Sequence, residues 1–409
     1  MGHFSNNKHE MKNFKGRARN WFYGVMLGPI LLFFRLINPI FKLRFVFTYT
    51  SQLGHLIGNL ETHLLDIRIN KHKRTLFIYY PDKNLISNKT VQTMWSRALP
   101  NYIVTPWLAH LLYWCDVICR NVSFLNVLSY SIRSCEFDGH DNDKTGTLLD
   151  TPPFFVFLPS ENKIGVNFLS EHNITPEKFV LLHSRDGKFS KNQIYRNTHI
   201  ENFFNAAKYF ASCGYSVIRT GVDVTTKIDD SIDYIIDYAS KYRTEFLDIY
   251  LSSQCSFYFG DSCGFFALAS SFRKPLVVTN NVPWFFTPFY YQNCIYITKK
   301  YWLMHEKRYM TFLEILKSGA GHFTKIKEEY ELNGILVHEN TPDELHDLAV
   351  EMIQRSRNQF VETAEDYELQ EKYTEILLKD PINIKANGAI RAKISTTFLR
   401  RNKQLLCDY

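Results

Sequence analysis

Between Lys178 and Asn280 the chain alternates short apolar runs with segments whose apolar residues have helical spacing. The runs are rich in valine, isoleucine, leucine and phenylalanine and lie at 179–182, 216–219, 256–259 and 276–279. Helical spacing is clearest in Ile200, Phe203, Ala207 and Phe210. Parallel strands need crossover connections, which are usually helices. The alternation therefore predicts an α/β domain with a doubly wound parallel sheet.

Two polar clusters follow strands of this segment. His183 to Asp186 come directly after the first run, and Gly260 to Gly264 come directly after the third. The carboxyl ends of parallel strands lie at one edge of a sheet, where ligands bind, and helix N-termini at that edge attract phosphate. The planar guanidinium of Arg185 can pair with two phosphate oxygens. The two clusters together predict a site for a nucleotide diphosphate.

Further candidates for donor binding lie at neighbouring strand ends and helix starts. The full predicted donor site comprises His183, Arg185, Asp186, Arg196, Arg219, Glu245, Asp248, Asp261, Ser262, Cys263 and Gly264. A purely structural role is open for several of them: Arg185 can form an ion pair with Asp186 or Asp248, and Arg196 can be an exposed loop base. The chain contains neither a GxGxxG fingerprint nor a GxxxxGK[ST] phosphate loop, which argues against dinucleotide enzymes and P-loop ATPases.

A second βαβ unit precedes this segment. Its first strand is expected at 45–49, its helix carries an apolar stripe from Leu56 to Ile67, and its second strand is expected at 75–80. With 409 residues, 45% of them hydrophobic, the chain is long enough for two or three domains. Its eight cysteines are scattered and form no CxxC pair, which favours a reducing compartment. Asp138, Asp141 and Asp143 lie close in sequence but lack the rest of a calcium loop, so no metal site is predicted.

The first 44 residues carry a net charge of +7, equal to that of the whole chain. Within them, Trp21 to Phe34 is an uncharged apolar run too short to span a bilayer, which takes about 20 residues. Aromatic residues beside basic flanks are typical of a segment lying on an anionic membrane surface. A buried helix of the first domain is the alternative. The remainder of the chain has no net charge, so a basic nucleic-acid-binding face is not expected.

Several short motifs give the chain a family resemblance. They are LGHL at 53–56, FVLLHSRD at 179–186, YRN at 195–197, EFLD at 245–248, GDSCG at 260–264 and KP at 274–275. With them the chain resembles bacterial glycosyltransferases of surface-carbohydrate biosynthesis, of the GT-B type with a fucosyltransferase-like donor domain. The resemblance covers most of residues 45–402. Asp186 stands where a second arginine is usual in the donor-phosphate motif.

The resemblance implies transfer of a sugar from a nucleotide-sugar donor to a glycan or lipid-linked acceptor, with no cofactor and no required metal. After the basic and apolar segment (1–43), the predicted architecture has two Rossmann-like domains facing across a cleft (acceptor, 44–170; donor, 174–340) and C-terminal helices bridging them (341–409). Direct displacement needs a base, and His55 and then Glu61 are the candidates. His55 can equally be a helix-start residue bonded to backbone.

The expected location is cytoplasmic, at the inner face of the cytoplasmic membrane. A catalytically inactive protein of the same architecture, binding a nucleotide sugar or a glycan, is the alternative function.

Overall fold

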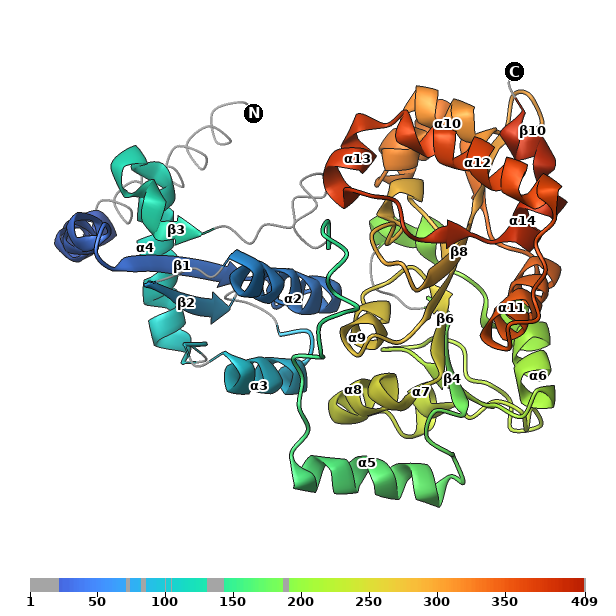
Figure 1. Ribbon diagram of the computed structural model, residues 1–409, viewed down its shortest axis with the longest axis horizontal. Coiled ribbons are helices and arrows are strands. Elements are labelled where there is room, and N and C mark those ends of the chain that lie inside the picture. Colours follow the sequence, from blue (N-terminus) through green and yellow to red (C-terminus); the bar gives the residue numbers. More distant parts are fainter. Residues whose placement is uncertain are drawn as a thin grey trace, which may run out of the picture. The chain divides into compact units, whose positions relative to one another are not determined.

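The computed structural model describes residues 22–70, 74–81, 86–99, 101–103, 105–130, 143–186 and 191–407. The chain forms two compact units, Met1–Arg133 and Ser134–Tyr409. Each contains a parallel sheet flanked by helices, which confirms the predicted α/β class (Figure 1). The boundary between the units differs from the predicted one near residue 170, because the helix at 159–171 packs against a helix of the larger unit.

The smaller unit has a three-stranded parallel sheet in the order β2-β1-β3. Its strands are β1 (Lys42–Thr48), β2 (Thr75–Pro81) and β3 (Ser129–Tyr130). Its helices are an N-terminal helix (22–37), α2 (Leu53–Asn70), α3 (Lys89–Ala98), α4 (Pro106–Asn121) and the turn η1 (Ser123–Leu128). The predicted βαβ unit is thus β1, α2 and β2, paired in parallel from Lys42 with Thr75 onward.

A buried carboxylate ties α4 to this sheet. Asp116 is 2% exposed and accepts hydrogen bonds from Tyr80 Oη at 2.5 Å and from Ser129 Oγ. Arg120, one helical turn further on, pairs with it at 2.9 Å. Because buried carboxylates must be hydrogen-bonded or paired, Tyr80 and Ser129 fix α4 against β2 and β3, while Arg120 pairs with Asp116 within α4.

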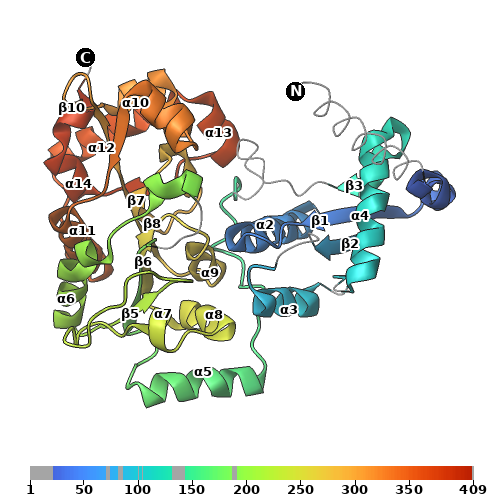
Figure 2. The ribbon, with the colours of Figure 1, turned by 180° about the vertical axis from the view of Figure 1, so that it is seen from behind.

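The larger unit has a six-stranded parallel sheet in the order β5-β4-β6-β7-β8-β12. Its strands are β4 (Phe179–His183), β5 (Ser216–Thr220), β6 (Phe257–Asp261), β7 (Leu276–Asn281), β8 (Cys294–Thr298) and β12 (Lys393–Ile394). Figures 1 and 2 show α8 (Glu245–Gln254) and α9 (Phe266–Ser271) on one face, with α6 (Phe204–Ser212) and α11 (Pro342–Ser356) on the other. This layering is that of a doubly wound sheet.

The rest of the larger unit consists of short elements around that sheet. A small antiparallel sheet has the order β10-β9-β11, formed by β9 (Lys300–Leu303), β10 (Arg308–Tyr309) and β11 (Ile335–His338). The other α-helices are α5 (Pro159–Glu171), α7 (Tyr238–Lys241), α10 (Phe312–Ser318), α12 (Ala364–Leu378), α13 (Pro381–Asn387) and α14 (Thr396–Arg401). Single helical turns lie at η2 (Lys191–Arg196), η3 (Ile200–Phe203), η4 (Trp284–Phe286), η5 (Ala320–His322), η6 (Ile326–Tyr330), η7 (Glu331–Asn333) and η8 (Lys403–Leu406).

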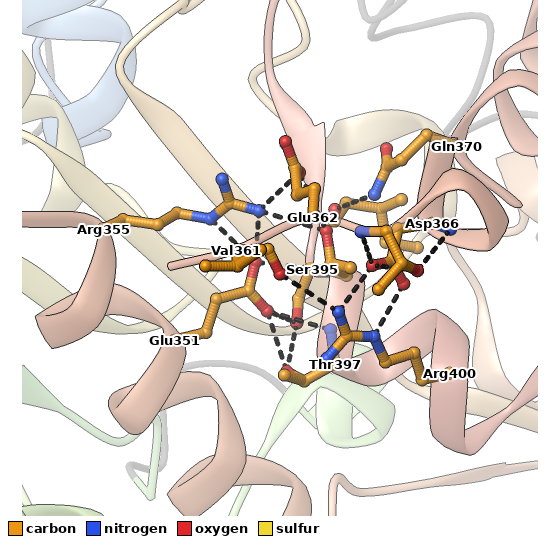
Figure 3. A network of polar contacts seen from close by, with 12 residues as sticks. Glu351, Arg355, Val361, Glu362, Asp366, Gln370, Ser395, Thr397 and Arg400 are labelled. Carbon is orange, nitrogen blue, oxygen red and sulfur yellow. Dashed lines mark hydrogen bonds and ion pairs between the residues drawn. The ribbon is translucent and has the colours of Figure 1, made fainter. Parts of the chain in front are cut away.

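The C-terminal helices, expected as a separate bridging segment, belong to the larger unit. A polar network holds them there (Figure 3). The carboxylate of Glu351 in α11 is fully buried and accepts from Ser395 Oγ at 2.6 Å and from the backbone N–H of Thr397 at 3.0 Å. It therefore neutralises the N-terminus of α14. Arg400 of α14 pairs with Asp366 of α12 at 2.5 Å, and this hydrogen bond holds the pKa of Asp366 well below its usual range.

Candidate functional site

The site candidates lie where the strand order of the larger sheet reverses. After β4 the chain moves outward to β5 and then returns to the opposite side of β4 as β6. His183, the last residue of β4, pairs with Thr220 on one side and with Gly260 on the other. In open α/β sheets the crevice outside the carboxyl ends of such strands is the usual ligand site.

The structure brings the two predicted clusters together at this edge of the sheet. The backbone N–H of Arg185 donates to Asp261 Oδ2 at 2.8 Å, across the ends of β4 and β6. Arg196, at the end of η2, donates from Nη2 to the carbonyl oxygen of Ser262 at 2.7 Å. The residues after β4 and the residues after β6 therefore form one continuous surface.

Three cations gather there: Arg185, Arg196 and Lys299. Arg185 donates to Gln193 Oε1 at 2.9 Å, and Lys299 Nζ donates to the carbonyl oxygens of Tyr195 and Asn197 at 3.0 and 2.6 Å. Burial, with Arg196 close by, lowers the pKa of Arg185 to about 10. Burial also lowers the pKa of Lys299 to about 8, with Arg185 and Arg196 contributing. Mutual repulsion of this kind makes a nearby anion favourable.

One donor of this cluster has no partner in the described part of the chain. The Nε–H of Arg196 is buried and meets no hydrogen-bond acceptor among the described residues. An orphaned, charged donor costs free energy unless a ligand or water satisfies it. A phosphate oxygen has the charge and acceptor geometry for it, so the donor set fits a phosphate group.

Asp261 was predicted to contact the donor, but its buried carboxylate links the strand ends that form the site. It is 1% exposed. Besides the Arg185 N–H, it accepts from Thr198 Oγ1, from Thr279 Oγ1 at 2.9 Å and from Asn280 Nδ2 at 2.9 Å. Four donors occupy its lone pairs, so Asp261 joins the ends of β4, β6 and β7 and is not placed to bind a ligand.

His183 and Cys263 form a contact pair beside the cations. Cys263 Sγ lies 3.7 Å from both ring nitrogens of His183, and the ring stacks on Phe265 with centroids 5.6 Å apart. Burial alone would raise the pKa of Cys263, but the adjacent His183 outweighs it and brings the pKa to about 7. His183 is 7% exposed, and its ring packs between Cys263, Phe265 and Tyr258.

The helix start after β6 contributes less than predicted. Helix α9 has only six residues, and the Phe265 N–H before it donates to Cys263 Sγ at 3.3 Å. Ser262 is 5% exposed and acts through its carbonyl oxygen, which orients Arg196. Gly264 is partly exposed in the same turn. The positive charge at this crevice comes mainly from side chains, because a helix this short has a small dipole.

Arg219 and Asp186 are structural, contrary to the prediction. Arg219 is fully buried and pairs with Asp237 at 2.8 Å and Asp186 at 3.1 Å. Its Nη2 also donates to the carbonyl oxygen of Thr226 at 2.9 Å. These contacts tie the loop after β5 to the end of β4. The guanidinium is enclosed by carboxylates and is not available to a phosphate.

Asp248 is also structural. It is 1% exposed and is held by Arg243 and by Tyr238 Oη, each at 2.8 Å. Burial raises its pKa to about 6. Glu245 lies in the first turn of α8, where a carboxylate favours the helix N-terminus. Asp248 is therefore enclosed and does not contact the donor, whereas a contact of Glu245 with the donor stays a prediction.

The two candidate bases lie in the smaller unit. His55 is in the first turn of α2, just after the carboxyl end of β1, and is partly exposed with its ring 6.0 Å from that of Tyr49. In the strand order β2-β1-β3, the end of β1 is again a point where the order reverses. Glu61 lies in the middle of α2 and is only 3% exposed. His55 therefore remains the candidate base, whereas Glu61 is enclosed.

Lys299 is the residue of the site that the sequence reasoning missed. It follows β8 directly, as Arg185 lies just beyond β4, so a base after a predicted strand was the available signal. Within the described ranges, no group of three or more His, Cys, Asp or Glu is placed to hold a metal. Asp143 caps its own turn by accepting from the Leu148 N–H at 2.6 Å, while Asp138 and Asp141 lie outside the described residues.

Comparison with solved structures finds partial similarity to glycosyltransferases. One is the glycosyl transferase family 9 protein of Veillonella parvula, with 14% identity, 63% of this chain and 86% of that chain covered, and a TM-score of 0.40. Another is ADP-heptose lps heptosyltransferase II of E. coli, with 11% identity and a TM-score of 0.37; the match covers 62% of this chain and 90% of that chain. E. coli heptosyltransferase WaaC with ADP matches at 8% identity, 63% and 93% coverage and a TM-score of 0.36. No family model and no curated protein matches the sequence.

Proposed function

We propose that the protein is a glycosyltransferase that binds the diphosphate of a nucleotide sugar at the carboxyl edge of its larger sheet. The observation that carries this proposal is the cluster of Arg185, Arg196 and Lys299 at the point where the strand order reverses. The buried Nε–H of Arg196 supplies a donor for a phosphate oxygen. The same proposal has three further parts. The protein pairs an acceptor unit with a donor unit, as in the GT-B type, its acceptor is a surface glycan or is lipid-linked, and the reaction needs no metal.

The proposed reaction is a displacement at the anomeric carbon of the sugar. The acceptor hydroxyl oxygen forms the new bond to that carbon, and the bond from the carbon to the diphosphate oxygen breaks. The diphosphate leaves with the electron pair, and the guanidinium groups of Arg185 and Arg196 offset its growing charge. Preorganised charges of this kind usually contribute most to the rate. The hydroxyl proton passes to His55, since an imidazole nitrogen can accept a proton as a general base.

Calorimetric titration with UDP, GDP, ADP and CDP tests the site. Arg185→Ala and Arg196→Ala should each weaken binding of the preferred nucleotide about 10- to 150-fold, as expected for loss of one charge-assisted contact of about 1.5–3 kcal/mol. Arg357→Ala is the control, because Arg357 is an exposed base after α11 whose guanidinium, in the described hydrogen bonds, donates only to the Cys213 carbonyl. Equal affinity in all three variants would exclude the phosphate role.

Turnover separates an enzyme from a binding protein of the same fold. Release of nucleotide diphosphate from a bound nucleotide sugar should need an acceptor and should fall in His55→Ala, with donor affinity unchanged. Donor binding without any release of nucleotide diphosphate across an acceptor panel would favour the inactive alternative.

A further inference from the structure

The N-terminal helix (22–37) of the smaller unit has two apolar faces. One face packs on α4: Leu27 and Leu31 are 4% and 0% exposed, and the ring of Tyr23 stacks on Trp114 with centroids 4.6 Å apart. This contact belongs to the main hydrophobic core of the unit. The helix is therefore a folded part of the unit, as the buried-helix alternative required.

The opposite face is equally apolar and is exposed. Its side chains recur every three or four residues and are 44–65% exposed: Phe22, Val25, Met26, Ile30, Leu32, Phe33 and Leu36. Ile40, in the turn that follows, is 72% exposed. Beside the helix, the guanidinium of Arg35 lies 4.5 Å from the ring centroid of Phe124, which is 51% exposed. We call this surface, from Phe22 to Ile40 with Phe124, the outer face. An exposed apolar patch that is continuous along a helix marks an interaction site.

In the sequence, the charges on either side of this helix are all of one sign. Residues 11–60 contain no Asp or Glu and seven Lys or Arg: Lys12, Lys15, Arg17, Arg19, Arg35, Lys42 and Arg44. Lys42, which directly follows the turn, is exposed. An apolar stripe bordered by cations is the pattern of helices that lie in the interface of an anionic bilayer.

We propose that the outer face lies flat on an anionic lipid bilayer, with its apolar side chains among the acyl chains and the bases Arg35 and Lys42 at the head groups. The helix has 16 residues, a length of about 24 Å along its axis. No helix in the described part of the chain is long and apolar enough to cross a membrane, so the attachment is peripheral. Each base near the surface adds up to about 1 kcal/mol of attraction to anionic lipid.

A second copy of the chain fits the outer face less well. A two-fold contact would place identical surfaces together, and each would bring Arg35 and Lys42, with no acid in residues 11–60 to pair with them. Like charges across an interface are unfavourable. A bilayer containing anionic lipid supplies the missing negative charge and an apolar phase at the same place.

The test uses the full chain and sedimentation with two kinds of vesicle. One is phosphatidylcholine alone, and the other is equal parts phosphatidylcholine and phosphatidylglycerol. The double variant Phe33→Glu, Leu36→Glu should lower partition onto the anionic vesicles at least about tenfold. The matched control is Leu332→Glu, Val361→Glu, which adds the same charge at two apolar side chains of the larger unit that are 80% and 76% exposed. It should change partition less than about twofold.

Two results would overturn the proposal. One is equal partition of the double variant and the control; the other is a solution dimer that the outer-face variant dissociates and that accounts for the patch. Wild type should also bind phosphatidylcholine vesicles more weakly than anionic ones, and equal binding would remove the role of the bases. Thermal unfolding checks that the variants are folded. The double variant Phe33→Ser, Leu36→Ser adds no charge and should also bind anionic vesicles more weakly than the control.

Discussion

Arginines 185 and 219 lie near the ends of adjacent strands, yet the structure gives them opposite roles. Arg219 is fully buried with Asp237 and Asp186, whose side chains are 2% and 6% exposed. Arg219→Ala leaves two carboxylates buried without their cation. Breaking a buried pair in this way costs about 3–5 kcal/mol, which for a unit of this size lowers the melting temperature by roughly 6–20 °C.

Asp237 determines how the stability lost in Arg219→Ala depends on pH. Burial tends to raise its pKa, but hydrogen bonds from Ser240 and Arg219 outweigh this and hold the pKa below the ordinary value. A carboxyl group with a depressed folded pKa contributes stability above its unfolded pKa, and that stability is lost as pH falls through the folded pKa. The cost of Arg219→Ala should therefore be full near neutral pH and shrink below about pH 4.

Thermal and urea unfolding measure this cost, and calorimetry measures nucleotide binding beside it. Arg219→Ala should lose stability, whereas Arg185→Ala should lose nucleotide affinity with nearly unchanged stability. Arg219→Met combined with Asp186→Asn and Asp237→Asn removes all three charges and should recover a large part of the lost stability. If Arg219→Ala unfolds like the wild type but no longer binds nucleotide, the roles assigned to these two arginines are reversed.

Four further outcomes are expected. Ser262→Ala should leave nucleotide affinity within about twofold of wild type by calorimetry, because the residue acts through its carbonyl oxygen, whereas Arg196→Ala should weaken it. Glu351→Gln should cost about 2 kcal/mol in urea unfolding by weakening five hydrogen bonds around α14 and Arg355. Cys263, with a pKa of about 7, should react with iodoacetamide about tenfold more slowly near pH 6 than near pH 8, measured by mass spectrometry. Nucleotide affinity should fall as pH rises through about 8, because Lys299 then loses its charge.

The alternation of apolar runs and helical segments was enough to predict the larger sheet and the edge where its site lies. Strands β4 to β7 fall on the four predicted runs, and the residues after β4 and β6 meet at hydrogen-bonding distance. The role of each charged residue depends on its contact partners, which the sequence pattern does not reveal. Arg219 is enclosed because residue 236 pairs back onto β5 and brings Asp237 beside it. Lys299 joins Arg185 only because β8 lies in the same sheet, more than a hundred residues later in the chain.

The contrast between Asp261 and Arg196 shows why a polar turn after a strand is a weak guide to contact with ligand. Asp261 has the position expected of a ligand-binding residue. Its two oxygens instead accept hydrogen bonds from a backbone N–H, two hydroxyls and an amide, and these bonds join the strand ends. That anchoring fixes the backbone of residue 262, whose carbonyl oxygen orients Arg196. A carboxylate that is fully hydrogen-bonded in this way thus positions the backbone beside Arg185 and Arg196 instead of binding a ligand itself.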